Sequence, residues 1–240
     1  MNQYAFMVSS AINTKFGIFN SEQRLAQTLD TIQSIRDRVP GAKIILVEMG
    51  AIPLTQDQTD RLTNATDYIL NFNNDPSVVE LFNSTDNWDI VKNITEVMCF
   101  SRGLGQIVEH TDLLHNVQRI FKMSGRYTLS DEFDIGYYEQ YSVQSHIVVS
   151  HRRNSQFPYN LTLVEKQFMS RLWSWPMSLT NEILEVYNQG LQYMEQRILA
   201  GGYCDIEHML YKFLDHNKII EKDAVGVCGN IGPNGAPVKD

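Results

Sequence analysis

Hydrophobic and polar positions follow one another along the first fifty residues in the order strand, helix, strand. Residues 4–8 form an apolar run, which predicts a buried strand. From Ser21 onward, apolar residues recur every three or four positions, which predicts an amphipathic helix over residues 22–38 with Ser21 as its N-cap. A Pro-Gly pair ends this helix, and residues 42–48 predict a second buried strand. Short links between these three elements predict a right-handed parallel crossover.

The pattern repeats up to residue 130 and then changes to segments that alternate as strands of an antiparallel or mixed sheet edge do. The further predicted elements are a helix over residues 55–64, strands over 67–72 and 119–123, a helix over 88–110, strands over 141–150 and 161–172, helices over 180–199 and 206–216, and a loop from 226 onward. We therefore expect one α/β domain over residues 1–240. Its half over 1–130 has a mostly parallel, Rossmann-like sheet that binds a nucleotide, and its half over 131–240 is mixed and binds an acceptor.

Charge and cysteine content exclude several classes of protein. The chain has 20 Lys and Arg against 28 Asp and Glu, which gives a formal charge of −8. Proteins that bind nucleic acid by neutralising phosphates need a surplus of basic residues, so this balance argues against a nucleic-acid partner. Three distant cysteines, Cys99, Cys204 and Cys228, form neither a disulfide framework nor a paired-cysteine metal site. With no signal peptide and no membrane segment in the sequence, we expect a cytoplasmic protein.

Polar groups follow the predicted strands at the edge where an open parallel sheet binds its ligands. The residues at these strand ends suit hydrogen bonds to a base and a ribose; they are Ser9, Ser10, Ala11, Glu48 and Ser124. The first strand is followed by SSAIN and not by a glycine-rich phosphate motif, so a conventional NAD or ATP site is not predicted. Motifs of zinc proteases and serine hydrolases are absent from the sequence as well.

The segment around residue 125 carries the densest charge. Lys122 and Arg126 lie near the end of a predicted strand, where they could neutralise a diphosphate. Asp131 and Asp134 follow, and such a carboxylate cluster can hold Mg²⁺ or Mn²⁺. The alternative is an exposed acidic turn, with the two cations in ordinary ion pairs.

Two further groups of residues have a chemical and a purely structural interpretation. Asp205 and Glu207 open a predicted helix after a Gly-Gly pair, and either carboxylate could deprotonate an acceptor hydroxyl. The alternative is that Asp205 is only an N-cap and Glu207 only an acid of the first helical turn. Trp173 and Trp175 could stack on an acceptor sugar, or they belong to the core.

Five segments, taken in order, resemble a known family over most of the chain. They are SSAIN at residues 9–13, FNSEQRLAQTLDTIQSIRDRVPGAKIILVE at 19–48, KMSGRYTLSDEFD at 122–134, GGYCDIEH at 201–208 and GNIGPNGAP at 229–237. Together they resemble nucleotide-sugar glycosyltransferases of the GT-A type, of the small kind found in bacteria, phages and large viruses.

The resemblance implies a GT-A-like fold and transfer of a sugar from a nucleoside-diphosphate donor, such as a UDP or GDP sugar, to an acceptor hydroxyl. It implies a catalytic base at Asp205 or Glu207 and nucleoside contacts from Ser9, Ser10, Ala11 and Glu48. In this family a carboxylate motif after the fourth strand holds the diphosphate and a metal ion, often manganese. SGRY stands there in this sequence. Binding with Mn²⁺ or Mg²⁺ and binding without a metal, through Lys122 and Arg126, therefore both stay open.

The leading interpretation is a hexosyl- or pentosyltransferase that acts on a glycan in the cytoplasm of a bacterium or of a virus-infected cell. One alternative is a non-catalytic module that binds a nucleotide or sugar. A second is a phage-type transferase that acts on modified DNA bases, against which the net charge argues. A third is a nucleotidyltransferase, which would more usually carry a glycine-rich basic loop after the first strand.

Overall fold

The computed structural model describes residues 3–141, 145–231 and 234–240, and in these ranges seven strands form the central sheet. Their order is β10-β6-β9-β4-β1-β2-β3, and β9 alone runs antiparallel to its neighbours in that sheet. The strands are β1 (Tyr4–Ser10), β2 (Lys43–Glu48), β3 (Tyr68–Asn71), β4 (Arg119–Ser124), β6 (Ile147–Ser150), β9 (Leu172–Pro176) and β10 (Ile219–Lys222). A mostly parallel sheet with mixed strands in its second half is the architecture that the sequence predicted.

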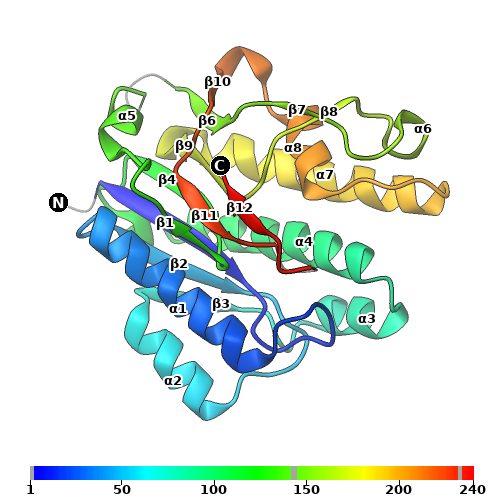
Figure 1. Cartoon of the computed structure of the whole chain (residues 1–240), viewed down its shortest axis with the longest axis horizontal. Coiled ribbons are helices and arrows are strands. Elements are labelled where there is room, and N and C mark those ends of the chain that lie inside the picture. Colours follow the sequence, from blue (N-terminus) through cyan, green and yellow to red (C-terminus); the bar gives the residue numbers. More distant parts are fainter. Residues whose placement is uncertain (1–2, 142–144, 232–233) are drawn as a thin grey trace.

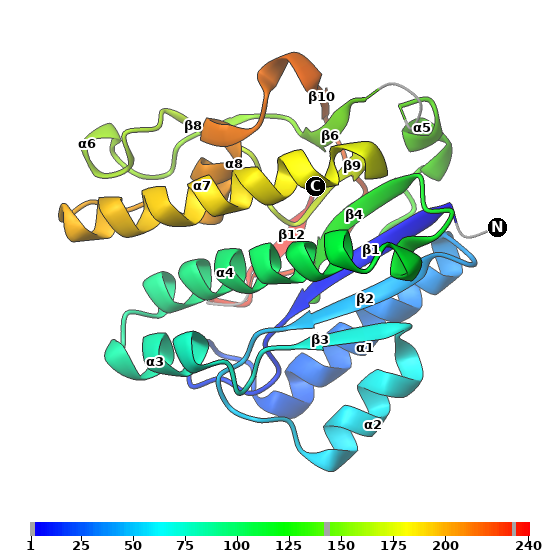
Figure 2. The same cartoon turned by 180° about the vertical axis from the view of Figure 1, so that it is seen from behind.

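Helices cover both faces of this sheet (Figures 1 and 2). One face carries α1 (Ser21–Arg38) and α2 (Gln56–Ala65), and the other carries α4 (Trp88–Glu109), α7 (Thr180–Leu199) and α8 (Ile206–Phe213). The side chains of β1 alternate between the two, because Phe6 belongs to the core cluster beneath α1, and Met7 to the cluster beneath α4. Both side chains are fully buried, so β1 is an interior strand covered on both faces in a three-layer structure.

The predicted crossover at the start of the chain is confirmed, with a shift of one residue at the helix cap. α1 is capped by Asn20 and not by Ser21. The Asn20 side chain accepts a hydrogen bond from the backbone N–H of Gln23, and the Gln23 side chain accepts one from the N–H of Asn20. This reciprocal pair is a capping box, which fixes where the chain leaves the loop after β1 and enters the helix.

The second half departs from the sequence prediction. The predicted strand over 161–172 is wrong, because α6 (Tyr159–Thr162) and the short β8 (Lys166–Gln167) occupy most of it. Leu163 ends α6 in the left-handed conformation, with φ of 54°, and this turn interrupts the alternating pattern. The predicted strand over 141–150 includes residues 142–144, which lie outside the described residues, and β6 occupies its end. Helices α3 (Pro76–Ser84) and α5 (Ile135–Glu139) were not predicted.

The C-terminal segment forms strands where the sequence predicted a loop. Strand β11 (Val227–Asn230) pairs with β12 (Pro237–Lys239) and with β5 (Tyr127–Leu129), which gives a three-stranded antiparallel sheet in the described chain. Residues 232–233 of the predicted loop lie outside the described residues. A two-stranded sheet joins β7 (Arg153–Asn154) to β8. Short 3₁₀ helices complete the fold at Thr111–Leu114, Met177–Leu179 and His216–Lys218. Among the described residues, no helix has the length and apolar character needed to cross a bilayer.

Candidate active site

A pocket of about 200 Å³ lies over the carboxyl ends of β1, β2 and β4. The chain proceeds from β1 to β2 and β3 on one side, and then returns through α4 to place β4 on the other side of β1. Such a switch point is where open α/β sheets bind their ligands. The predicted residues that the structure brings together in its wall are Ser9, Ser10, Ala11, Ser124 and Arg126.

The turn between β4 and β5 forms one wall of the pocket because Gly125 allows it to approach β1 closely. The Gly125 N–H donates a 2.8 Å hydrogen bond to the carbonyl of Ser9, and the Thr28 hydroxyl donates to the Gly125 carbonyl. A Cβ atom at Gly125 would stand 2.9 Å from the Ser9 carbonyl oxygen and 3.2 Å from the Thr28 hydroxyl. This approach places Arg126 at the pocket.

Glu48 lies beneath the pocket and is fully buried. Its carboxylate accepts hydrogen bonds from the Ser10 hydroxyl and from the backbone N–H groups of Ile12 and Gly50, each 3.1 Å away. Burial raises the pKa of Glu48, and these hydrogen bonds oppose that rise. Glu48 therefore shapes the loop after β1 from behind, whereas the sequence resemblance implied direct contact with a nucleoside.

Lys122 is also fully buried, and its charge is already neutralised. Its Nζ lies 2.6 Å from the Glu96 carboxylate and donates hydrogen bonds of 2.9 Å to the Ser124 hydroxyl and the Ser170 carbonyl. The Ser9 hydroxyl donates to the same Glu96 oxygen at 3.1 Å. Lys122 thus supports the pocket from within, and it is not a free cation for a diphosphate.

Arg24 on α1 holds the loop after β1 in place. Its guanidinium donates to the carbonyls of Phe19, at 3.0 Å, and Phe16, at 2.7 Å, and reaches that of Ala11 at 3.4 Å. The side chain is 8% exposed, and its pKa is lowered to about 10 by burial and by the nearby charge of Arg126. Arg24 and Arg126 are therefore two cations held close together at one wall of the pocket.

The outer end of the pocket is aromatic. It is lined by Phe16, Phe82 and Trp88, with the rings of Phe16 and Phe82 in edge contact at 5.7 Å between centroids. Lys15 lies over both rings and forms a 2.8 Å ion pair with Asp86, which joins the loop after β1 to the segment before α4. Aromatic faces of this kind can stack on a planar base or on the apolar face of a pyranose.

Asp205 and Glu207 lie together at the start of α8. Asp205 caps that helix, because its Oδ1 accepts from the His208 N–H at 2.9 Å and lies 2.5 Å from the ring Nδ1 of His208. One Glu207 oxygen accepts a 2.6 Å hydrogen bond from the Ser170 hydroxyl. Burial, followed by the charge of Asp205, raises the pKa of Glu207, and the charge of Lys92 opposes this rise. Glu207 is not among the residues that line the pocket, but Ser170 and Lys122 connect it by hydrogen bonds to the lining residue Glu96.

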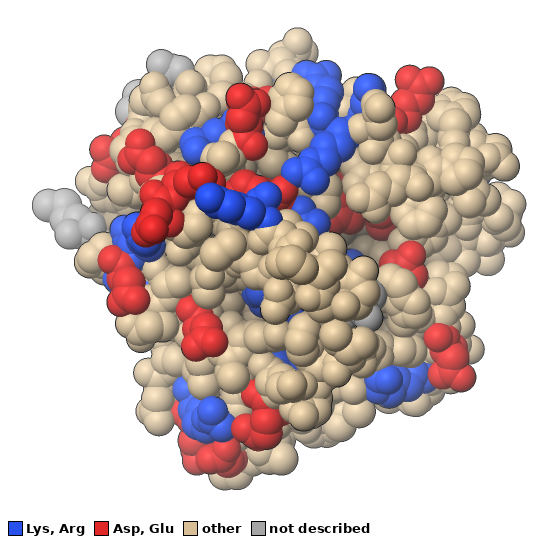
Figure 3. Space-filling model, in the orientation of Figure 1, with Lys and Arg blue, Asp and Glu red and all other residues tan. Residues whose placement is uncertain are grey.

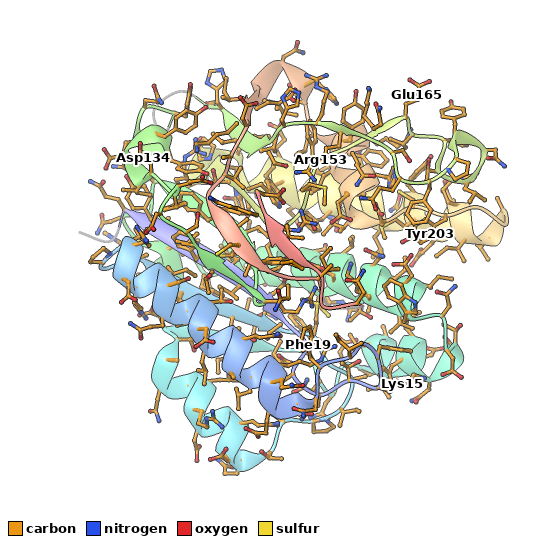
Figure 4. The ribbon with its side chains drawn as sticks, in the orientation of Figure 1. Lys15, Phe19, Asp134, Arg153, Glu165 and Tyr203 are labelled. Atoms are coloured by element: carbon orange, nitrogen blue, oxygen red, sulfur yellow. The ribbon has the colours of Figure 1, made fainter. Side chains whose placement is uncertain are left out.

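Four other predicted residues lie elsewhere. Asp131 forms an ion pair with Arg38 at the last turn of α1, and Asp134 caps α5. Figure 4 shows Asp134 at the opposite end of the sheet from Lys15. The chain reverses in β5, which carries both carboxylates away from the pocket. Trp173 and Trp175 are fully buried in the core, where their rings pack at a tilt with 4.7 Å between centroids, so neither presents a face to an acceptor.

The residues at the pocket do not fit a divalent metal site. Such an ion needs several oxygen ligands, usually including carboxylates. Glu96 is the one carboxylate of the pocket lining among the described residues, and it already pairs with Lys122. The described chain contains no cluster of three His, Cys, Asp or Glu side chains that could hold a metal.

Sequence reasoning missed the pocket residues that come from helices. Trp88, Lys92 and Glu96 on α4 lie four residues apart and line the pocket in a row. This spacing puts them on one helical face, so a polar stripe on a helix that begins near the sheet edge was the available signal. Arg24 on α1 had no comparable signal in the sequence.

Comparison with solved structures identifies the class of the fold. The chain is similar to core-mannan synthase A (CmsA/Ktr4) from Aspergillus fumigatus in its Mn/GDP form, with a TM-score of 0.54 and 10% identity over 98% of this chain and 77% of that one. It is similar to the mannosyltransferase Ktr4p from S. cerevisiae with the same TM-score and identity, over 99% of this chain and 73% of that one. No protein-family model and no curated protein matches the chain. The chain has the GT-A-like fold that its sequence implied.

Proposed function

We propose that the protein is a glycosyltransferase that moves a sugar from a nucleoside-diphosphate donor to an acceptor hydroxyl. The observation that carries this proposal is the pocket at the switch point of a GT-A-like sheet, with cationic side chains in its wall and Glu207 linked to it through Ser170 and Lys122. The aromatic end of the pocket suits a base or a sugar ring, and the cations suit a diphosphate. The two similar solved proteins are described as mannan-synthesising or mannosyl-transferring enzymes, one of them in a Mn/GDP form.

Glu207 is the stronger candidate for the base. Asp205 has one oxygen engaged by the backbone N–H and the ring of His208, whereas the Glu207 carboxylate accepts one hydrogen bond among the described residues, from the Ser170 hydroxyl. A half-buried carboxylate with a raised pKa is a stronger base than an ordinary glutamate, which suits it to accept a proton from the acceptor hydroxyl. In the proposed step the acceptor oxygen bonds to the anomeric carbon while its proton passes to Glu207. The bond from that carbon to the diphosphate breaks, and the diphosphate leaves with the electron pair.

A glycan hydroxyl is the proposed acceptor. On the face shown in Figure 3, one short run of basic side chains lies at the upper centre and the others stand singly or beside acidic side chains, so they do not form a basic surface across this face. A DNA acceptor would need such a surface to neutralise its phosphates. We therefore extend the proposal to a hexosyl or pentosyl group and a glycan, in an enzyme with no nucleic-acid partner.

The test measures donor binding and turnover separately. UDP, GDP, UDP-glucose and GDP-mannose are titrated into the protein by calorimetry, and release of nucleoside diphosphate from the sugar donors is followed with a panel of glycan acceptors. Glu207→Gln keeps the shape and the acceptor oxygen for Ser170, so we expect donor affinity within about threefold and a turnover lower by about 10² to 10⁴. Glu165→Gln is the matched control, because Glu165 is exposed on the segment before β8 (Figure 4).

Each outcome bears on one interpretation. No binding of any of these nucleotides contradicts the proposed function. Binding of a donor by the wild type without turnover on any acceptor supports the alternative of a non-catalytic module. Equal turnover in Glu207→Gln and Glu165→Gln removes Glu207 from the role of base, since Glu207 is linked to the pocket through Ser170 and Lys122, whereas Glu165 is exposed.

A further inference from the structure

The pocket is positively charged although the chain as a whole is acidic. Its described lining contains three cations, Arg24, Lys92 and Arg126, and one carboxylate, Glu96. That carboxylate is already balanced by the buried Lys122 behind it. A concave site with a surplus of one charge focuses the field and attracts ligands of the opposite sign. In a chain with a formal charge of −8, this local surplus marks a site for an anion.

Two of these cations make no side-chain hydrogen bond and no ion pair within the described chain. Arg24 donates to three backbone carbonyls, whereas neither Lys92 nor Arg126 has a side-chain hydrogen bond or ion pair within the described chain. The Nε of Arg126 is buried and has no hydrogen-bond partner among the described residues. The hydroxyl of Thr95, one turn along α4 from Lys92, is buried and unpaired in the same way. Buried polar groups are almost always hydrogen-bonded, so these two groups in the pocket lining are free to bond a polar ligand.

The same wall is unsuited to a divalent cation. The Ser124 hydroxyl accepts from Lys122, and the close approach to Ser9 leaves no room for any side chain at Gly125. A divalent cation placed here would share the pocket wall with Lys92 and Arg126. The charge of Glu96 would not offset theirs, because Lys122 already neutralises it. Like charges repel most strongly at short range in a partly buried site. The wall that would have to hold a metal is therefore built to hold an anion directly.

We propose that Lys92 and Arg126, with the Thr95 hydroxyl, bind the diphosphate of the donor directly and take the place of a metal ion. The inference rests on the proposed function for the identity of the ligand. The Arg126 guanidinium can donate two parallel hydrogen bonds to phosphate oxygens, and Lys92 supplies a point charge. The charge of Lys92 acts on both Glu96 and Glu207, so a diphosphate bound at Lys92 lies within electrostatic reach of the proposed base. The negative charge that develops on the leaving diphosphate is thus stabilised beside the carboxylate that takes the acceptor proton.

The experiment titrates UDP, GDP and inorganic pyrophosphate into the full chain by calorimetry, once with EDTA and once with Mn²⁺ or Mg²⁺. We expect the metal to change the affinity for the tighter nucleotide by less than threefold. Lys92→Gln and Arg126→Gln are each expected to lower the affinity for that nucleotide at least tenfold, while the affinity for the corresponding nucleoside changes by less than threefold. Arg126→Lys should recover part of the loss, because it restores the charge without the bidentate geometry.

Arg61→Gln is the control for removal of a cation, since Arg61 lies on α2 outside the pocket lining. Thermal unfolding of every variant separates loss of binding from loss of fold. A tenfold or greater gain in affinity with Mn²⁺ or Mg²⁺ overturns the inference, and so does a diphosphate affinity that both Gln variants leave within twofold. Absence of binding by all three probes overturns it as well.

The inference and the proposed function fail in different ways. Metal-dependent donor binding with sugar transfer would overturn the inference and keep the function. Metal-free diphosphate binding that needs Lys92 and Arg126, without transfer to any acceptor, would support the inference and contradict the function.

Discussion

At the scale of single residues, the ion pair of Glu96 and Lys122 predicts how stability depends on pH. Burial acts to raise the pKa of Glu96, but the charges of Lys122 and Lys92 outweigh it and lower this pKa to about 2, from 4.5 in an ordinary glutamate. A carboxyl group whose pKa is lower in the folded than in the unfolded chain stabilises the fold at pH values above its unfolded pKa. This contribution to stability is lost as the pH falls from 4.5 towards 2.

Glu96→Gln should therefore destabilise the protein by about 3 to 5 kcal/mol at pH 6, because it leaves the Lys122 ammonium buried without a counter-charge. Between pH 6 and pH 3 the difference from wild type should shrink by roughly 2 kcal/mol. Urea unfolding at both pH values measures this. Glu165→Gln, on an exposed side chain, should differ little from wild type at either pH. A difference for Glu96→Gln that stays constant with pH would contradict the assignment.

At the scale of elements, the sequence predicted those that have a long, regular pattern. Helix α1 was predicted from apolar residues such as Leu25 and Ile32, which recur at helical spacing and are buried in the fold. Strands β11 and β12 were not, because they are four and three residues long, and β11, with which β12 pairs, itself pairs with β5 about a hundred positions earlier in the chain. Short strands of this kind are determined by distant partners, which a local pattern does not contain.

Two glycines in different elements give opposite predictions for the same substitution. Gly125→Ala should destabilise the protein by about 1 to 3 kcal/mol, since its Cβ would meet the Ser9 carbonyl and the Thr28 hydroxyl, and both lie in fixed backbone and helix positions. It should also weaken nucleotide binding, because the turn that carries Arg126 would move away from β1. Gly105→Ala is the matched control inside α4, where a Cβ meets nothing within 4 Å. It should stabilise by about 0.5 to 1 kcal/mol through helix propensity.

Urea unfolding of the two variants beside wild type checks the signs. Destabilisation by both substitutions would show that Gly105 is constrained in a way that the open space around it does not explain. A neutral Gly125→Ala with unchanged nucleotide affinity would show that the turn between β4 and β5 can move away from β1 at little cost in free energy.

At the scale of the whole molecule, the position of the pocket was predictable and its charged wall was not. The rule that ligands bind at carboxyl ends of parallel strands led to Ser9, Ser10 and Arg126, and these residues do line one pocket. Lys92 comes from a helix on the opposite face of the sheet to α1, so its meeting with Arg126 depends on tertiary packing. The sequence-based prediction placed Asp131 at the pocket because it is close in sequence to Arg126. The chain reverses through β5 and carries Asp131 to Arg38, and the residue pattern does not show this reversal.

Asp240 connects the small C-terminal sheet to the segments around the central sheet, and it supplies the last prediction. Its side chain is 2% exposed and forms ion pairs with Arg153, at 2.5 Å, and with Arg171, while its carbonyl accepts from the N–H groups of Gly226 and Val227. Arg171 in turn lies over the ring of Tyr127 in β5. Asp240→Asn removes the charge between two arginines and keeps the shape, so it should destabilise by about 1 to 3 kcal/mol in urea unfolding.

The expected loss should be accompanied by faster amide hydrogen exchange across β11, because β12 and the Asp240 carbonyl protect one side of that strand. Asp223→Asn is the control, since that side chain is fully exposed and should leave both measurements unchanged. If Asp240→Asn behaves like Asp223→Asn, the two arginines find sufficient solvation without the carboxylate. In that case only the backbone pairing of β11 with β5 would hold the C-terminal sheet in place. Substitutions in the C-terminal strand should then not alter the position of the turn that carries Arg126.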